Sequence, residues 1–190
     1  VYPLVKSLSE IAGIASILIA SELMNSSSVG NGLILGNIGG VPPSRVVIIG
    51  EGTVAEFAAR SALGLGAIVE VFDNSLTKLR NLQHKLNFPI ATSTLQPKNL
   101  LKSLVDCDVA IGAIRGKYRT PIVVGENMVE QMKKGAVVVD VSIDNGELIY
   151  SNYNGSYKEA YRVENANHAD IPTVMGFDLF MNTIQVFLQK

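Results

Sequence analysis

Two glycines separated by one residue, Gly50 and Gly52, directly follow a run of β-branched residues, Val46–Ile49. An alanine-rich stretch comes next, and it leads to a second apolar run that ends at an acid, Asp73. A glycine lets the backbone turn sharply out of a strand, and the missing Cβ lets the backbone approach a bound group closely. A helix that begins at such a turn offers free N–H groups and the positive end of its dipole to an anion. The pattern is therefore typical of a pyrophosphate site.

Asp73 extends this interpretation from a phosphate to a dinucleotide. It lies roughly 20 residues beyond the glycine turn, where a carboxylate accepts hydrogen bonds from the hydroxyls of an adenosine ribose. Ala55, which completes the Gly-x-Gly-x-x-Ala pattern, is expected to let the helix pack close to the sheet. A glycine turn alone is weak evidence, because any tight connection between a strand and a helix can use one. The strand before it, the helix after it and the acid together favour dinucleotide binding over an incidental turn.

The charges near this turn bear on which dinucleotide binds. A carboxylate at Asp73 repels a 2′-phosphate and no Arg follows it directly, so NAD is favoured over NADP. Lys78, a little further along the chain, would soften that preference. Glu51 brings a negative charge beside the expected pyrophosphate, and two like charges 4 Å apart repel by ~1 kcal/mol in water and ~4 kcal/mol near a protein surface. The sequence leaves open whether Glu51 faces the phosphates or the solvent.

Length and composition are those of one α/β domain. The chain has 190 residues, of which 47% are hydrophobic, and a net charge of −1. This length allows a sizeable core, and the charge provides no basic face for nucleic acid or a membrane surface. The lone Cys107 cannot form an internal disulfide, which fits a cytoplasmic setting, and we interpret it as a small buried residue rather than a reactive thiol. The two His residues have no metal-ligand spacing, so no metal site is expected.

Apolar runs alternate with helical segments through the middle of the chain. This order predicts an α/β fold of the Rossmann type, a doubly wound and mainly parallel sheet with helices on both faces. We expect a single domain over residues 1–190 with its core at 33–145. The expected strands are 33–35, 45–49, 68–72, 89–92, 108–112, 136–141 and 161–163, and the expected helices between them are 52–65, 75–86, 97–105 and 126–133.

A further helix is expected at each end of the domain, over residues 8–24 and 174–188. Ser9 is predicted to cap the first of them. The most apolar run of this helix, Ile11–Met24, is too short to span a bilayer, so we interpret the helix as part of the core and expect no membrane span. Apolar residues nevertheless surround it almost completely. They indicate an exposed flank that a missing domain or a partner subunit covers, and we expect a homo-oligomer.

Other candidate residues follow the later strands, because ligands of doubly wound sheets bind beyond the carboxyl ends of the strands. Gly112-Ala113-Ile114 follows the strand expected at 108–112, either as a turn of small residues that approaches a cofactor or as an ordinary strand end. Asp144 follows the next strand, where a carboxylate can transfer a proton or orient a carboxamide. The composition Asp144-Asn145-Gly146 also favours a plain turn.

Three longer stretches are distinctive: Pro3–Gly13, Gly39–Gly50 and Lys133–Asp144. In the second, Val41-Pro42-Pro43 comes just before the strand expected at 45–49, which is unusual among Rossmann proteins. Together the stretches resemble the NAD-binding domain of the alanine dehydrogenases and of the related proton-translocating transhydrogenase, over about residues 3–145. The resemblance implies reversible oxidative deamination of L-alanine to pyruvate and ammonia, with hydride passed to NAD.

The resemblance also implies roles for single residues. Asp144 is implied to be the active-site acid that faces a small-molecule substrate, an amino acid or a 2-oxo acid. The implied cofactor-binding residues are Ser9 at the phosphates; Gly50, Gly52, Thr53 and Val54 at the pyrophosphate; Asp73 and Lys78 at the ribose; and Ala113 and Ile114 at the nicotinamide.

The chain departs from the family pattern in two ways. The family's substrate domain, which precedes this one and carries a catalytic His and a substrate-binding Lys, has no counterpart here, so we expect the chain alone to bind cofactor without turning over alanine. The likeness fades after Asn145, and the segment Ala166–Thr173 lacks the Arg of the family pattern, so no role is carried over to His168. Two alternatives therefore stay open: a transhydrogenase-type subunit that presents NADH to a partner, and a non-catalytic NAD-sensing or interaction domain.

Overall fold

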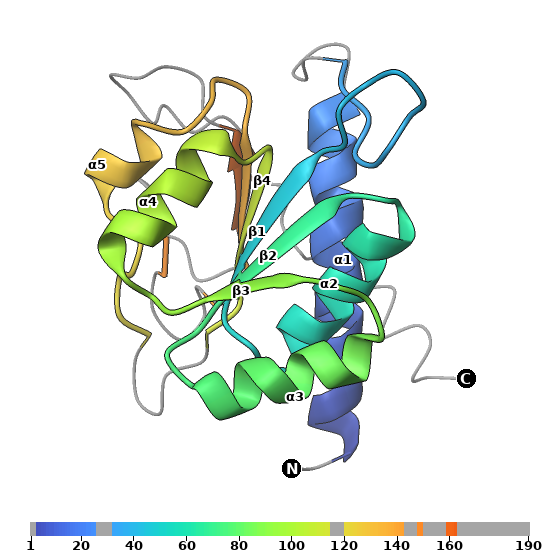
Figure 1. The fold of residues 1–190 in the computed structure, drawn as a ribbon, viewed down its shortest axis with the longest axis vertical. Coiled ribbons are helices and arrows are strands. Elements are labelled where there is room, and N and C mark those ends of the chain that lie inside the picture. Colours follow the sequence, from blue (N-terminus) through green and yellow to red (C-terminus); the bar gives the residue numbers. More distant parts are fainter. Residues whose placement is uncertain (1–2, 26–31, 115–119, 143–147, 150–158, 163–190) are drawn as a thin grey trace.

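Helices cover both faces of one sheet (Figure 1). The structure is a computed structural model that describes residues 3–25, 32–114, 120–142, 148–149 and 159–162. Its elements in chain order are α1 (Pro3–Asn25), β1 (Arg45–Ile49), α2 (Thr53–Gly64), β2 (Ile68–Phe72), α3 (Leu76–Leu86), β3 (Ala91–Ser93), α4 (Pro97–Asp106), β4 (Val109–Gly112), α5 (Glu126–Val129), β5 (Val137–Asp140) and β6 (Glu159–Arg162).

The strand order is β3-β2-β1-β4-β5-β6. The first five of these strands are parallel to their neighbours, and β6 joins β5 in antiparallel register. The order reverses beside β1, so the carboxyl ends of β1 and β4 flank the point where ligands of doubly wound sheets bind. The predicted fold class is confirmed.

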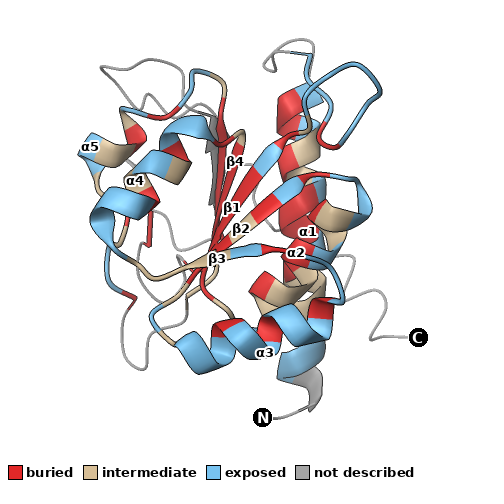
Figure 2. Cartoon of the chain, viewed as in Figure 1, coloured by how far each residue is buried: buried red, intermediate tan, exposed pale blue. Residues whose placement is uncertain are grey.

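Alternate residues of the strands supply two separate cores. In β1, Val46 and Ile48 pack into the layer of α1, α2 and α3, whereas Val47 and Ile49 pack into the layer of α4 and α5. Because both faces of a parallel sheet are covered, its central strands β1, β4 and β5 are mainly apolar, as the β-branched runs of the sequence indicate. Figure 2 shows this arrangement as buried residues along the strands and on the inner sides of the helices.

Helix α1 is longer than predicted. It begins at Pro3 rather than at residue 8, because proline is tolerated in the first turn of a helix. The prediction that Ser9 caps this helix was therefore wrong: Ser9 lies inside it, and its hydroxyl donates a hydrogen bond to the carbonyl of Val5 at 2.9 Å. Serine within a helix commonly satisfies its hydroxyl in this way.

The length argument against a membrane span also changes. The stretch Val5–Asn25 has 21 residues and is long and apolar enough to cross a bilayer by length and composition alone. The packing of α1 is that of a core helix, because Ala15 and Ile17 are completely buried in the core between α1, α2 and the sheet. The predicted apolar flank is present as well, since Ile14 is 39% exposed and Leu18 is 57% exposed.

Two smaller predictions were wrong. Residues 33–35 form no strand. Leu33 N donates to the Met24 carbonyl at 3.2 Å, and the Ile34 carbonyl accepts from the Ser44 hydroxyl at 3.2 Å, so this backbone bonds to the end of α1 and to a side chain in place of a neighbouring strand. Helix α5 ends at Val129 instead of 133, and the chain continues in tighter turns such as Met132 N to Val129 O. The helix predicted at 174–188, Asp144 and His168 lie outside the described residues.

Candidate functional site

The turn between β1 and α2 depends on glycine at Gly50. Its φ of +118° is disfavoured for residues with a side chain. A Cβ at this position would also lie 2.5 Å from the carbonyl oxygen of Ala113 and 2.9 Å from the nitrogen of Ile114. Two candidate regions that are far apart in the sequence, the glycine turn and the exit of β4, are therefore in direct backbone contact.

Gly52 is a different case. It is the N-cap of α2 with an ordinary φ of −70°, and it supplies no side-chain cap. A Cβ added at Gly52 would meet nothing within 4 Å, so neither backbone conformation nor internal packing requires glycine here. The space that a side chain would fill lies at the start of α2, where the first N–H groups of a helix, here those of Thr53 and Val54, have no partner within the helix. Gly52 thus leaves open a cradle that suits a phosphate group.

Asp73 lies next to this turn. The N–H of Gly50 donates to the carbonyl of Phe72 at 2.8 Å, so the residue before Asp73 is bonded to the first glycine. Asp73 is half-buried, and its Oδ1 accepts a hydrogen bond from the N–H of Ser75 at 2.7 Å. A carboxylate has about four acceptor sites, so this bond orients the group and leaves acceptor capacity for ribose hydroxyls.

Glu51 faces a side chain rather than the solvent. Its Oε1 lies 2.5 Å from Nζ of Lys78 in the first turn of α3, and its side chain is only 15% exposed. The hydrogen bond and charge of Glu51 raise the pKa of Lys78, and Asp73 adds to this effect. A hollow of about 350 Å³ lies beside the pair, and its lining includes Asn81 and His84. The structure thus brings together Glu51, Lys78 and Asp73.

Ser9 lies on the helix that packs against the start of α2. On α1, Gly13 lies so close to α2 that a Cβ there would be 2.4 Å from the carbonyl oxygen of Val54. Residues four apart share a face of a helix, so Ser9 is one turn before this contact and on the same side. Its hydroxyl hydrogen is donated within α1, and its oxygen retains acceptor capacity.

One further acid at the same edge of the sheet, within the strand expected at 136–141, was not among the candidate site residues. Asp140, the last residue of β5, is 1% exposed, and its Oδ1 accepts from Ser142 N at 2.8 Å. Its Oδ2 accepts from Leu148 N at 2.8 Å and from Ile149 N at 3.1 Å. These bonds tie together the two sides of the segment 143–147, which carries Asp144. The signal in the sequence is an acid that ends a run of three valines, because a charge at that place requires buried partners.

The thiol of Cys107 has the inert environment that its sequence context predicts. It is fully buried, and burial, with a smaller effect of Asp108, raises its pKa to about 12. Almost none of it is thiolate near neutral pH, which argues against nucleophilic chemistry at this residue.

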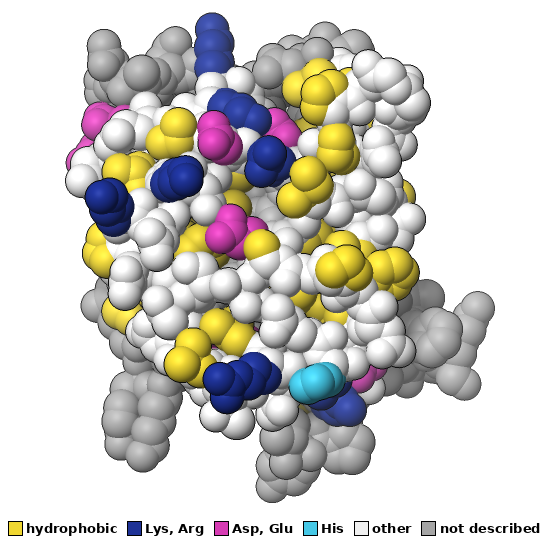
Figure 3. Space-filling view, viewed as in Figure 1, with side chains coloured by type: hydrophobic (Ala, Val, Ile, Leu, Met, Phe, Trp, Pro, Cys, Tyr) yellow, Lys and Arg dark blue, Asp and Glu magenta, His cyan; other side chains and the backbone are white. Residues whose placement is uncertain are grey.

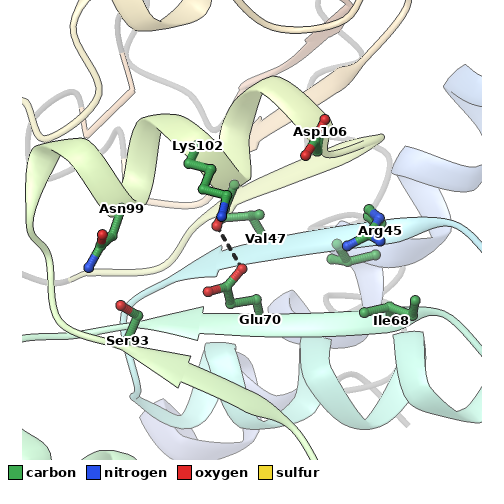
Figure 4. A pocket seen from close by; sticks show the side chains of 10 residues that line it. Arg45, Val47, Ile68, Glu70, Ser93, Asn99, Lys102 and Asp106 are labelled. Atoms are coloured by element: carbon green, nitrogen blue, oxygen red, sulfur yellow. Dashed lines mark hydrogen bonds between the residues drawn. The ribbon is translucent and has the colours of Figure 1, made fainter.

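A second cavity, of about 320 Å³, lies away from the glycine turn, between α4 and the strands β1 and β2 (Figure 4). Its lining is polar and of mixed charge, with Arg45 and Lys102 near Glu70 and Asp106. Glu70 accepts a hydrogen bond from the Ser103 hydroxyl at 2.7 Å, which the dashed line marks. The surface around it likewise intersperses basic and acidic side chains (Figure 3). None of the predicted site residues that the structure describes lines this cavity.

Comparison with known proteins identifies the family of this chain. The family model described as "Alanine dehydrogenase/PNT, C-terminal domain" matches residues 16–178. The chain belongs to this family. The family resemblance inferred from the glycine turn and its neighbouring stretches is confirmed.

Curated members of the alanine dehydrogenase/PNT family are similar in sequence. The alanine dehydrogenase of Staphylococcus saprophyticus is 38% identical over 147 residues, which cover 77% of this chain and 40% of that protein. That of Bacillus subtilis is 36% identical over 148 residues, with 77% and 39% covered. The chain thus spans about two-fifths of the length of the curated relatives it matches.

Solved structures agree with the fold. An L-alanine dehydrogenase superposes with a TM-score of 0.76 at 34% identity, over 81% of this chain and 43% of the other. A transhydrogenase from Sinorhizobium meliloti superposes with a TM-score of 0.66 at 21% identity, over 81% and 44%. At that lower identity the second match shows the common fold alone.

Proposed function

We propose that this chain is the NAD-binding domain of an alanine dehydrogenase-like oxidoreductase. The observation that carries the proposal is the open cradle at Gly52, at the first turn of α2 and beside the carboxylate of Asp73. Open space at a helix N-terminus suits a pyrophosphate, and the neighbouring acid suits a ribose. NAD would supply the hydride acceptor of the reaction.

The residues of the chain hold and orient the cofactor in this proposal. The start of α2 binds the pyrophosphate through backbone N–H groups, and Asp73 accepts hydrogen bonds from the ribose hydroxyls. The backbone at the exit of β4, in contact with Gly50, lies on the nicotinamide side. The proposed binding residues are Ser9, Gly50, Gly52, Thr53, Val54, Asp73, Lys78, Ala113 and Ile114.

Catalysis is proposed for the parent protein rather than for this chain alone. There Asp144 would act as the acid that faces the substrate, in the conversion of L-alanine and water to pyruvate and ammonia. A substrate domain outside this chain would supply the other catalytic groups. The parent protein would act in the cytoplasm. It would be a homo-oligomer, because the apolar flank of α1 at Ile14 and Leu18 offers a surface for a second subunit.

Two observations favour this proposal over its alternatives. The curated alanine dehydrogenases are 36–38% identical, whereas the transhydrogenase structure is 21% identical. An uncompensated charge at Glu51 would weaken cofactor binding and so favour a non-catalytic domain, but that charge is paired with Lys78.

Calorimetric titration of the chain with NAD and NADP in parallel tests the proposal. We expect saturable binding of NAD and weaker binding of NADP. Gly52→Val is the test variant, because it fills the cradle with a branched side chain, and we expect it to abolish binding. Its circular dichroism and thermal midpoint should stay unchanged, because a Cβ at this position meets no protein atom within 4 Å. A wild-type chain that binds neither dinucleotide, or a Gly52→Val variant that binds NAD normally, would overturn the proposal.

A further inference from the structure

Three charged side chains converge on the proposed ribose site. Glu51 projects from the glycine turn to Lys78 on α3, with 2.5 Å between Oε1 and Nζ. The negative charge of Asp73 makes a smaller contribution than Glu51 to the raised pKa of Lys78. The glycine turn is joined to the end of β2 by the bond from Gly50 N to the Phe72 carbonyl, so all three charges lie around one strand end.

Each member of the Glu51–Lys78 pair removes a difficulty that the other would create. An unpaired Lys78 beside Asp73 would attract a 2′-phosphate, because a cation near this strand end is how NADP is accommodated in such folds. An unpaired Glu51 would repel the pyrophosphate. Paired, the two cancel in charge, and Asp73 leaves the ribose site with a net negative charge.

We propose that Glu51 is a specificity-determining residue that selects NAD against NADP by engaging Lys78. The inference rests on the proposed function, since it concerns the same dinucleotide site. It assigns Glu51 two effects: it neutralises the one cation of this three-residue group, and it places a carboxylate where a 2′-phosphate would approach. Lys78 in turn holds the Glu51 carboxylate away from the pyrophosphate.

The test is a double-mutant cycle with Glu51→Gln, Lys78→Met and the combined variant, each titrated with NAD and with NADP by calorimetry. For Glu51→Gln we expect NADP affinity to rise about tenfold while NAD affinity changes about threefold or less, because one charge near the 2′ position is removed. For Lys78→Met we expect NAD affinity to fall about tenfold, because the carboxylate of Glu51 is then unpaired. The combined variant should recover most of the lost NAD affinity without any gain for NADP.

A matched control comes from a second ion pair between α2 and α3, Glu56 with Lys85 at 3.0 Å. Glu56 lies in the first turn of α2, but its carboxylate pairs with Lys85 and Arg60 rather than with Lys78. Glu56→Gln should therefore leave the ratio of NAD to NADP affinity unchanged. Thermal midpoints establish that all variants are folded.

The outcomes separate the inference from the proposed function. A wild-type chain that binds no dinucleotide overturns both. A wild-type chain that binds NAD, with a Glu51→Gln variant whose ratio of NADP to NAD affinity is unchanged, overturns the inference alone. A combined variant that binds NAD as weakly as Lys78→Met also overturns it, because the loss would then not come from Glu51.

Discussion

Two aspartates end strands at the same edge of the sheet, and they have opposite surroundings. Asp140 at β5 is 1% exposed and accepts three backbone hydrogen bonds, whereas Asp73 beyond β2 is half-buried and its Oδ1 accepts one, from Ser75. The first carboxylate serves the chain's own backbone, and the second is left with capacity for something else. An acid at a strand end therefore indicates a ligand only where the following backbone does not fully use it.

The largest expected effect is the loss of stability on replacing Asp140, compared with the same replacement of Asp73. In Asp140→Asn one carboxylate oxygen becomes an amide nitrogen that cannot accept from backbone N–H groups, and buried donors lose their partner. We expect the free energy of unfolding to fall by about 2–4 kcal/mol. Urea denaturation measures it, with Asp73→Asn as the matched substitution, expected to cost less than about 1 kcal/mol. Equal losses at the two positions would contradict the comparison.

The two glycines of the β1–α2 turn also differ in whether the fold requires them. Gly50→Ala places a Cβ 2.5 Å from the Ala113 carbonyl oxygen at a φ of +118°, and we expect it to cost about 2–3 kcal/mol of stability. Gly52→Ala meets open space, and we expect a change within about 0.5 kcal/mol together with weaker NAD binding. Thermal unfolding and calorimetry on both variants distinguish a glycine that the fold requires from one that the ligand requires.

Asp73→Asn tests the role of the second aspartate through its effect on NAD and NADP affinity. Loss of the negative charge removes a strong acceptor for the ribose hydroxyls and the repulsion of a 2′-phosphate. We expect NAD affinity to fall about tenfold, equal to ~1.4 kcal/mol, and the gap to NADP to narrow. Parallel titrations with both dinucleotides measure it, and unchanged relative affinities would remove Asp73 from the ribose site.

The smallest expected effect on stability is that of replacing Glu56, whose carboxylate is paired with side chains at the surface. Burial by itself raises the pKa of Glu56, but hydrogen bonds and charges from Lys85 and Arg60 outweigh it and hold the pKa below the ordinary value of 4.5. A lowered folded-state pKa gives stability that is present above the unfolded value and is lost as the pH falls through the folded value. Glu56→Gln should therefore cost less than about 1 kcal/mol at pH 7, and the difference from wild type should shrink as the pH falls below 4.5 and through the lowered folded-state pKa. A difference that persists at the lower pH would contradict this origin.

The sequence predicted the parts of the fold that local pattern determines. Strands of β-branched residues, helices between them and the glycine turn are recognisable because each depends on neighbouring residues. The predicted start of α1 was wrong because a serine such as Ser9 resembles an N-cap in the sequence even where the helix has already begun. The strand predicted at 33–35 was wrong because the Ile34 carbonyl bonds to the distant side chain of Ser44 and Leu33 N bonds to the Met24 carbonyl.

The candidate site residues come from the sequence, but the contacts among them do not. Gly50 and Asp73 follow from spacing, whereas the backbone contact of Gly50 with Ala113 depends on the order of strands in the sheet. The pairing of Glu51 with Lys78 and the three bonds of Asp140 likewise join segments that only tertiary structure brings together. Side-chain charges can be read from a sequence, but which of them neutralise one another cannot.

The contact beneath Gly50 also constrains how this domain can diverge between lineages. A Cβ at Gly50 would meet backbone atoms of Ala113 and Ile114, so no compensating substitution elsewhere can make room for it. At Gly112 the crowding atoms belong to the side chains of Asp140 and Leu148, and a smaller residue at 148 would relieve part of it. In a random library we therefore expect second-site substitutions that make room for a side chain at position 112, and none that make room for one at position 50.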